Sequence, residues 1–364
     1  MRADLPSAVA SAIERCDRPS LIFDLATIEA NLAAIARAAR NAGVTALFAA
    51  KSFPHPEVRA IAARELDGFD AASTAEVIEL PAAGTLSIAD PTGRASAAAE
   101  RWPHRLIVSC DTVEQVHAAP ARAAIAIRLS ASLTGRDPAI GAVLDGSGHR
   151  RSRFGLDVAS ERRSQLIAAM ARAAGDRPIG LHIHHGPVAA TSSERFSATA
   201  RAAIAAASAA GVSPRFLNLG GAWHAIADLR TTLAEVRSAI ARDIEVLIEP
   251  GRLASEAAGF ACGHVVVARE LDDRPLRVVD VSRICHLRWS HIELVASAPH
   301  AGTGQRGLFV GPTCFEDDVL GDWTIAPDAF PPGARVVVRN VCGYAVAWNT
   351  GFGGVAPADV VVVS

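Results

Sequence analysis

Lys51 is the only lysine among the 36 lysine and arginine residues of this 364-residue chain. Arginine serves wherever a fixed positive charge suffices, but its guanidinium stays protonated in proteins and cannot attack a carbonyl. A lysine can lose its proton and form an imine, so Lys51 is a candidate covalent nucleophile. The alternative is that an alanine- and arginine-rich composition left one surface lysine by chance. The chain also has a single tyrosine, Tyr344.

Eight short apolar runs alternate with alanine-rich helical stretches from residue 20 to about residue 252. The runs are residues 46–51, 68–73, 86–90, 106–110, 124–130, 179–186, 216–221 and 245–251. Eight buried strands separated by helices predict an α/β fold in which a closed (β/α)8 TIM barrel forms the N-terminal domain. The Gly-, Ser- and Arg-rich segment 131–157 is the longest interruption, and we expect it to form an excursion above the barrel.

The character of the chain changes after residue 253. Valine-rich runs punctuated by glycine and proline follow, and helical periodicity is scarce. This pattern predicts a separate all-β domain. The expected domains are therefore a barrel of residues 20–253 and a β domain of residues 254–364, with residues 1–19 packing against the β domain.

Composition excludes several classes of partner and site. A net charge of -2 gives no electrostatic reason to bind nucleic acid or an anionic membrane surface. The six cysteines lack metal-binding spacing, so we expect reduced thiols and no metal site. The N-terminus has charges where a signal peptide needs an apolar stretch, and no apolar run approaches the ~18 residues that span a bilayer. The composition favours a cytoplasmic globular protein.

Polar residues recur where the predicted barrel strands end, which is where a (β/α)8 barrel carries its function. They are Lys51, Asp70, Arg128, His182, His184, Gly220, Gly221, Glu249, Gly251 and Arg252. Each has a structural alternative. Asp70 and Arg128 would form a buried ion pair, a strand histidine would be a hydrogen-bonded core residue, and the two glycines would mark only a tight turn. Their joint placement at one barrel mouth, together with the lone lysine, favours a functional site.

Eight short segments occur in an order that resembles one known family. They read FAAKSFPHPEV, GFDAASTAEV, SRFGL, GLHIHHG, LNLGGAW, IEPGR, GPTCFEDDVLG and CGYAVAWNTGFGG. The series resembles the fold-type III pyridoxal-phosphate decarboxylases, which include the ornithine, diaminopimelate, arginine and carboxynorspermidine decarboxylases. The resemblance runs from about residue 20 to the end. It implies an alanine racemase-like barrel followed by a β domain, in a homodimer with active sites at the interface.

The resemblance also implies roles for the residues at the barrel mouth. Lys51 would bind pyridoxal 5'-phosphate covalently, with Asp70 and Arg128 also among the cofactor-binding residues. His184 would stack on the pyridine ring. Glu249 would keep the pyridine nitrogen protonated, because a cationic ring is the electron sink when carbon dioxide leaves.

Other residues would contact the phosphate and the substrate. Gly220, Gly221, Gly251, Arg252 and Tyr344 would help to bind the cofactor, through backbone N–H groups and charge-assisted bonds to its phosphate. Cys314 would reach the active site across the dimer interface and return a proton to Cα. Its alternative is a buried packing residue. The implied substrate-binding residues are Arg252, Ser290, Cys314, Phe315 and Tyr344.

Three departures from the family pattern affect how the cofactor is held. Ala222 replaces a third glycine, Pro187 replaces a serine and removes a backbone donor, and Cys342 with Gly343 replaces the usual small pair before the tyrosine.

A fourth departure concerns the substrate. Phe315 and Ser290 stand where diamine-forming members have acidic residues. A buried distal ammonium without a carboxylate is costly, so we expect a substrate with a neutral, aromatic or anionic side chain. Arg283, Arg288 and His291 are candidates to meet an anion. The alternative is that one of the acidic residues 316–318 supplies the carboxylate after a shift in register.

The sequence thus predicts a pyridoxal-phosphate-dependent amino-acid decarboxylase acting on a small molecule. A racemase or epimerase on the same fold is the nearest alternative. A non-catalytic homologue that binds a partner should have lost the cofactor contacts, which persist here. A cofactor-independent aldolase would need no phosphate site.

Overall fold

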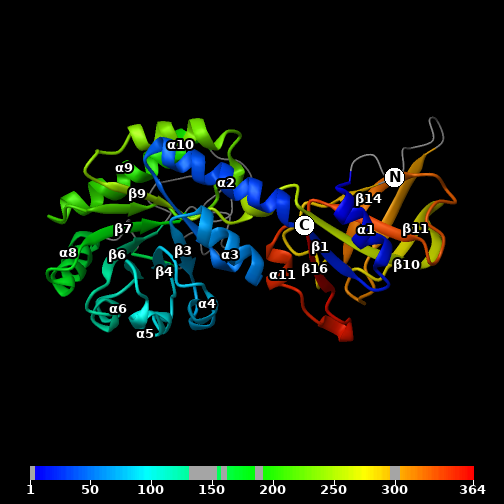
Figure 1. Cartoon of the computed structure of the whole chain (residues 1–364), viewed down its shortest axis with the longest axis horizontal. Coiled ribbons are helices and arrows are strands. Elements are labelled where there is room, and N and C mark those ends of the chain that lie inside the picture. Colours follow the sequence, from blue (N-terminus) through cyan, green and yellow to red (C-terminus); the bar gives the residue numbers. More distant parts are fainter. Residues whose placement is uncertain (1–4, 131–153, 157–161, 185–191, 296–303) are drawn as a thin grey trace. The chain divides into compact units, whose positions relative to one another are not determined.

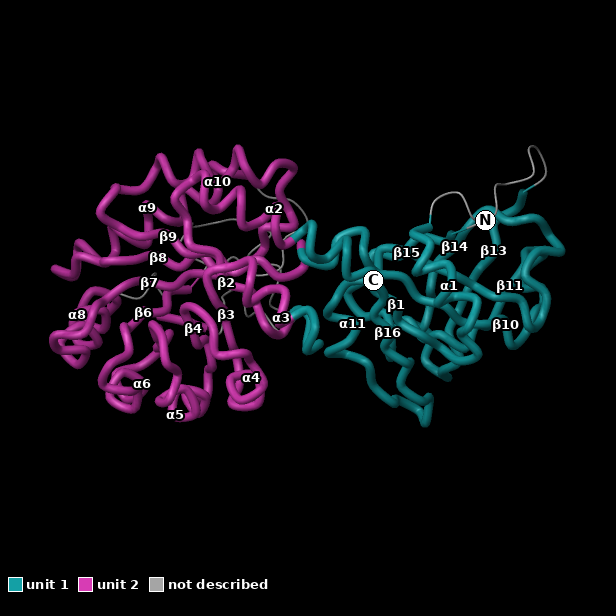
Figure 2. Tube along the Cα trace, in the orientation of Figure 1, with its two compact units in different colours: residues 1–31, 52–58, 254–364 teal, residues 32–51, 59–253 magenta. Residues whose placement is uncertain are grey.

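The computed structural model describes residues 5–130, 154–156, 162–184, 192–295 and 304–364. The chain divides into two compact units, which Figure 2 distinguishes by colour. Unit 1 contains residues 1–31, 52–58 and 254–364, and unit 2 contains residues 32–51 and 59–253. Among the described residues, no helix is both long enough and apolar enough to cross a membrane.

Unit 2 is built on a closed barrel of eight parallel strands that pair in chain order. The strands are β2 (Thr45–Ala49), β3 (Gly68–Ala71), β4 (Thr85–Ile88), β5 (Leu106–Cys110), β6 (Ala124–Leu129), β7 (Ile179–Ile183), β8 (Phe216–Asn218) and β9 (Glu245–Ile248). Each overlaps one of the eight predicted runs, with β2 and β4 beginning one residue earlier, so the predicted barrel is confirmed.

Helices connect the strands and surround the barrel in Figure 1. They are α2 (Leu25–Ala42), α3 (Pro56–Glu65), α4 (Thr74–Glu79), α5 (Ala95–Ala98), α6 (Val113–Ala118), α8 (Arg163–Ala174), α9 (Ser193–Ala209) and α10 (Leu229–Ser238). Most of the excursion predicted at 131–157 lies outside the described residues. Its described part returns to β6, where Leu156 forms a bridge with Leu129.

Apolar side chains from the strands fill part of the barrel interior. One buried cluster consists of Leu47, Ile107, Ala124, Ala126, Phe216 and Leu247. Phe216 lies so close to β7 that a Cβ on Gly180 would be 2.4 Å from its ring. This packing accounts for the glycine within a buried strand, and it gives the functional side chains a rigid base.

Unit 1 contains an eight-stranded sheet. Its strands are β1 (Ser20–Asp24), β10 (Gly259–Leu271), β11 (Arg274–Val279), β12 (Glu293–Leu294), β13 (Gln305–Val310), β14 (Val319–Ile325), β15 (Arg335–Arg339) and β16 (Asp359–Val363). β1 pairs antiparallel with β10 and parallel with β16. It therefore belongs to this sheet, whereas the sequence assigned residues 20–24 to the barrel domain. A fully buried apolar strand does not reveal from its own residues which sheet it joins.

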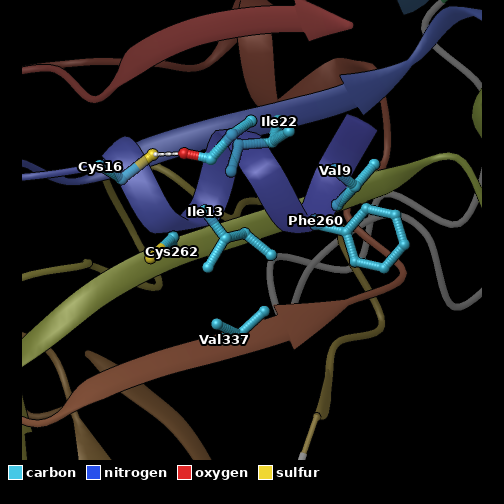
Figure 3. Close-up of a cluster of buried hydrophobic side chains, with 8 residues drawn as sticks. Val9, Ile13, Cys16, Ile22, Phe260, Cys262 and Val337 are labelled. Atoms are coloured by element: carbon cyan, nitrogen blue, oxygen red, sulfur yellow. Dashed lines mark hydrogen bonds between the residues drawn. The ribbon is translucent and has the colours of Figure 1, made fainter. Parts of the chain in front are cut away.

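Residues near the N-terminus pack against this sheet. Helix α1 (Ser7–Arg15) buries Val9 and Ile13 beside Phe260 and Val337, as Figure 3 shows. The helix places its apolar face on the sheet, where it covers residues of β1, β10 and β15. The described fold also contains helix α11 (Tyr344–Ala347), which follows β15 in unit 1.

Candidate active site

Lys51 lies just beyond the end of the first barrel strand. β2 ends at Ala49, and the short 3-10 turn η1 (Ala50–Ser52) carries the lysine. Its Nζ donates to Asp70 Oδ2 at 2.9 Å, and the Asp70 side chain is fully buried. Asp70 Oδ1 is buried without a hydrogen-bond partner among the described residues. The lone lysine is therefore held by a buried carboxylate, which distinguishes it from a chance surface lysine.

Glu249 follows the last barrel strand and is 3% exposed. Asn218 Nδ2 donates to Glu249 Oε1 at 2.7 Å. Burial, and after it the negative charge of Asp70, raise the pKa of Glu249 to about 8, although Lys51 and Asn218 act in the opposite direction. The carboxyl is thus poised to hold a proton at neutral pH until a positive charge lies next to it.

His182 lies on β7 beside Glu249, with its Nε2 3.6 Å from Glu249 Oε1. Its Nδ1 is 2.7 Å from Ser109 Oγ. Burial lowers the pKa of His182 well below its ordinary value, and the positive charge of Arg128 acts in the same direction. A neutral imidazole whose Nδ1 accepts the Ser109 hydroxyl proton presents an Nε2–H toward Glu249. His182 therefore adds no positive charge beside this carboxylate, and its Nε2 is too far from Glu249 for a hydrogen bond.

Three further polar side chains lie inside the barrel near Glu249 and His182, and the sequence analysis did not single them out. Together they form a polar layer of the barrel interior. Ser87, Ser109 and Asn218 are buried on β4, β5 and β8, and Asn218 Nδ2 is also 3.5 Å from Ser87 Oγ. Barrel interiors are ordinarily filled by branched apolar side chains. Polar residues inside otherwise apolar strands were the signal that would have located this layer.

Gly220 and Gly221 follow β8 and lie against His184. A Cβ on Gly220 would be 2.8 Å from His184 Cδ2, and one on Gly221 would be 3.1 Å from His184 Nε2. Gly220 also has φ +64°, a conformation that favours glycine. Ala222, the next residue, adopts φ +72° although it carries a Cβ. The two glycines make room for the His184 ring, and the departure at Ala222 places an alanine in a left-handed conformation.

Glu76 is a second carboxyl of the lysine environment that the sequence analysis missed. Its Oε2 accepts the Ala72 N–H at 2.7 Å, and its own N–H donates to Ser73 Oγ at 3.2 Å. Ser73 is thus the N-cap of α4, and Glu76 reaches one residue further back than in a capping box, to the N–H before the cap. The S-x-x-E pattern was visible in the sequence. Burial raises the pKa of Glu76, and Lys51 and Asp70 are among the charges that act on it.

Arg128 does not pair with Asp70, which contacts Lys51. The Arg128 guanidinium instead lies over the Phe154 ring, 4.7 Å from its centroid. Gly251 and Arg252 follow Glu249 and are both half-buried, with Arg252 at the start of the 3-10 turn η5 (Arg252–Ser255). Pro187 lies outside the described residues.

The remaining predicted site residues belong to unit 1. Cys314 is the one exposed cysteine of six, and none of the six is in a disulfide. Phe315 is 49% exposed and its ring centroid lies 6.1 Å from that of Phe352. Tyr344 begins α11 and packs edge-on against Trp289, with 5.2 Å between ring centroids.

The assignment of Ser290 as a substrate contact needs correction. Its side chain is fully buried, and its Oγ accepts the Cys342 N–H at 3.1 Å and donates to Cys342 Sγ at 3.6 Å. The hydroxyl therefore ties two segments of unit 1 together. Arg283 is similarly committed, because its Nη1 donates to the carbonyls of Leu287 and Ser290.

The raised pKa of Glu249 predicts a pH dependence of stability in the ligand-free chain. Between pH 4.5, the ordinary pKa of a glutamate, and pH about 8, Glu249 is protonated in the folded chain and ionised in the unfolded chain. The stabilisation is therefore complete below pH 4.5 and is lost as pH rises through 8. Relative to Glu249→Gln, the free energy of unfolding should fall by about 1.4 kcal/mol per pH unit within this window.

Urea unfolding of both proteins at pH 5.5, 6.5 and 7.5 would measure this difference. The other groups facing Glu249 are Asp70, Lys51 and His182. They are present in both proteins, so their contributions largely cancel in the comparison. Parallel pH profiles would show that Glu249 is ionised in the folded chain.

Comparison with known proteins gives one family and one fold. A family profile described as "Pyridoxal-dependent decarboxylase, pyridoxal binding domain" matches residues 25–256. No curated protein sequence matches the chain. An arginine decarboxylase of Paramecium bursaria Chlorella virus, solved with agmatine, superposes with a TM-score of 0.79 at 16% identity, over 97% of this chain and 99% of that one.

Two further solved structures have the same fold. A lysine/ornithine decarboxylase from Vibrio vulnificus, solved with cadaverine, has a TM-score of 0.76 at 19% identity, and 97% of each chain is covered. A lysine decarboxylase from Selenomonas ruminantium has a TM-score of 0.76 at 20% identity, over 97% of this chain and 94% of that one.

Proposed function

This chain belongs to the family of pyridoxal-dependent decarboxylases, and from this premise we propose that it decarboxylates an amino acid whose side chain has no distal ammonium group. The cofactor is pyridoxal 5'-phosphate, and the reaction is that of a carboxy-lyase. The observation that carries the proposal is the contact of the lone lysine with buried Asp70, at the same barrel mouth as buried Glu249.

The residues of unit 2 fit this cofactor. Lys51 supplies a primary amine for the aldehyde carbon. Asp70 Oδ1 and His182 Nε2 are buried polar atoms without hydrogen-bond partners among the described residues. The paired glycines leave backbone beside His184 that a Cβ would fill. A polar aromatic ring with an aldehyde, a nitrogen and a phosphate matches this set of groups.

We assign the cofactor contacts accordingly. Lys51 would hold the aldehyde carbon, His184 would lie against the ring, and Glu249 would pair with the ring nitrogen. Gly220, Gly221, Gly251, Arg252 and Tyr344 are assigned to cofactor binding, chiefly at the phosphate. Asp70 and Arg128 complete the assigned set, Asp70 through its contact with the lysine nitrogen.

When bound, pyridoxal phosphate accepts the electron pair that remains on Cα as carbon dioxide leaves. The chain's contribution is to keep the ring nitrogen protonated and to manage the other proton. Glu249 has a pKa raised to about 8 in the ligand-free chain, so it can carry the proton that the ring nitrogen needs. The Asn218 hydrogen bond then stabilises the carboxylate that is left.

Cys314 is assigned the return of a proton to Cα. In this step the S–H bond breaks and a C–H bond forms, and solvent reprotonates the thiolate. The thiol is exposed on unit 1, which suits a group that must meet a substrate. The other five cysteines are buried. Burial raises the pKa of two of them, Cys110 and Cys262, to about 12, which makes them poor proton donors.

Two contacts around Cys314 support the proposed substrate class. The residue after it is the exposed Phe315, paired with Phe352. Asp318 is 2% exposed and its oxygens accept hydrogen bonds from Ser282, Arg283, Ile284 and Thr313, so it does not serve a distal ammonium. An aromatic or neutral side chain fits Phe315, and of the three acidic residues 316–318 only Glu316 and Asp317 are exposed enough to meet a cation. Arg288, exposed and stacked on Trp348, stays a candidate partner for an anionic one.

The solved relatives are described as arginine, lysine and lysine/ornithine decarboxylases, which act on amino acids with distal cations. At 16–20% identity, the similarity to these structures shows a shared fold and does not identify the substrate of this chain. The difference in substrate class is a proposal about this chain and needs its own test.

A panel of amino acids incubated with the purified holoenzyme tests the proposal. We expect kcat/KM for the best neutral, aromatic or anionic substrate to exceed that for lysine, ornithine or arginine by at least about 100-fold. Release of carbon dioxide and formation of the amine should both be measured. Efficient turnover of ornithine, lysine, arginine or diaminopimelate would overturn the substrate class, and loss of substrate chirality without carbon dioxide release would indicate racemisation.

The proposal includes a homodimer in the cytoplasm that binds only small molecules. The absence of disulfides among the six cysteines is compatible with reduced thiols. Light scattering of the purified holoenzyme would test the dimer.

A further inference from the structure

A buried carboxylate terminates the segment that carries Cys314. Asp318 is 2% exposed, and five donors reach it. Its Oδ2 accepts the Thr313 N–H at 3.2 Å and the Thr313 hydroxyl at 2.7 Å. Its Oδ1 accepts the Arg283 N–H at 2.6 Å and the Ile284 N–H at 3.4 Å, and the Ser282 hydroxyl lies 3.0 Å from both oxygens. A buried charge with this many donors fixes the groups around it.

The segment of residues 311–318 closes around this carboxylate. The Gly311 N–H donates to the Asp318 carbonyl at 2.7 Å, and the Asp318 N–H donates to the Phe315 carbonyl at 3.0 Å. A Cβ on Gly311 would lie 2.2 Å from Asp318 Oδ2, so only glycine leaves room for the side chain. The Phe315 N–H is 3.4 Å from Thr313 Oγ1. Cys314 therefore lies between two residues whose backbone is held by the network.

The same network reaches two other segments of unit 1. The Ser282 N–H donates to His286 Nδ1 at 3.1 Å, and His286 Nε2 donates to the Ala356 carbonyl at 3.0 Å. Burial lowers the pKa of His286, which agrees with a neutral ring whose Nδ1 is an acceptor. Segments 282–286 and 311–318 are thus linked through Ser282 and Asp318, and residues 352–356 join them through Ala356 and the Phe315–Phe352 contact.

We propose that Asp318 is the positioning residue for Cys314, holding the thiol in place by anchoring the turn of residues 311–318 to segment 282–286. This inference rests on the proposed function, in which Cys314 returns the proton to Cα. The carboxylate is suited to the task because it only accepts hydrogen bonds and faces only donors. An asparagine would turn an NH2 group toward one of them and release that part of the turn.

A double-mutant cycle in the holoenzyme tests the coupling. Cys314→Ala should lower kcat about 100-fold with little change in KM. Asp318→Asn should lower kcat at least about tenfold in the same manner. Adding Asp318→Asn to Cys314→Ala should then change kcat less than twofold, because the thiol it positions is already gone. If Asp318→Asn lowered kcat by the same factor in the wild type and in Cys314→Ala, the positioning role would be overturned.

Alkylation of the resting holoenzyme gives a readout that needs no turnover. Cys314 is the one exposed cysteine, so iodoacetamide should modify it selectively. We expect the thiol of Asp318→Asn to alkylate at least about threefold faster, since the turn that holds it is released. Asp328→Asn makes the same change at an exposed position of unit 1 and should match the wild type. An unchanged rate in folded Asp318→Asn would overturn the proposal.

Thr313→Val provides a milder variant if Asp318→Asn does not fold. It removes one hydroxyl donor and keeps the carboxylate. We therefore expect kcat to fall and alkylation of Cys314 to become faster, each by about a third of the effect of Asp318→Asn. A folded Thr313→Val with wild-type alkylation and kcat would contradict the inference. A Cys314→Ala enzyme with wild-type kcat would defeat the assigned role of the thiol, while the alkylation rates would still decide whether Asp318 positions it.

Discussion

Replacing Lys51 by arginine is expected to lower decarboxylation by about 10⁴-fold or more, to the limit of detection. Arginine keeps the positive charge, and it preserves an ion pair with the buried Asp70 carboxylate that Lys51 contacts at 2.9 Å. It cannot bond covalently to the cofactor aldehyde, because its guanidinium does not deprotonate. The variant therefore separates the chemistry of the amine from its electrostatic contribution to the fold.

Borohydride treatment of the holoenzyme followed by mass spectrometry measures the covalent link. Residue 51 should carry the reduced cofactor in the wild type and nothing in Lys51→Arg. Arg201→Lys adds a second lysine on α9, where the side chain is 52% exposed, and it should leave both the label at Lys51 and the activity unchanged. An unlabelled Lys51 in active wild-type enzyme would remove the premise on which the assigned site rests.

The barrel could be predicted because its signal is local. Each strand is a short buried run, helical stretches separate each strand from the next, and eight such strands close a barrel of ordinary size. Lys51, Asp70 and Glu249 could be placed for the same reason, since parallel strands carry their C-terminal residues to one mouth. β1 could not be assigned, because its partners β10 and β16 are more than 200 residues away in the chain.

The polar layer beneath the site depends on contacts that no spacing rule reveals. Ser109 and His182 lie on strands separated by β6, and Ser87 and Asn218 come from β4 and β8. Ser290 shows that a match to a sequence segment can also suggest a contact that the structure does not support. Its position in a matching segment suggested a substrate contact, but burial and the two contacts with Cys342 commit its hydroxyl to the fold. The state of a side chain follows from its neighbours, which the sequence does not identify.

Glu249→Gln is expected to lower kcat by about 10²–10³-fold while cofactor binding persists. Glutamine has the same shape, and its Oε1 can still accept the Asn218 hydrogen bond that spans 2.7 Å. It has no negative charge to pair with a protonated ring nitrogen, so the ring becomes a weaker acceptor of the electron pair left by carbon dioxide. The covalent link depends on Lys51, and borohydride should still label residue 51.

A matched substitution at the start of β9, the strand that Glu249 follows, separates this effect from damage to the barrel. Glu245 begins β9 and forms an ion pair with Arg105 at 2.8 Å. Glu245→Gln removes the same charge at the opposite end of the strand, and its kcat should stay within about twofold of the wild type, since surface ion pairs contribute little. If Glu249→Gln kept wild-type kcat with a labelled Lys51, the ring nitrogen would not need the carboxylate. The raised pKa and buried polar neighbours of Glu249 would then be features of the fold alone, and the electron-accepting ring would have to be protonated by another group.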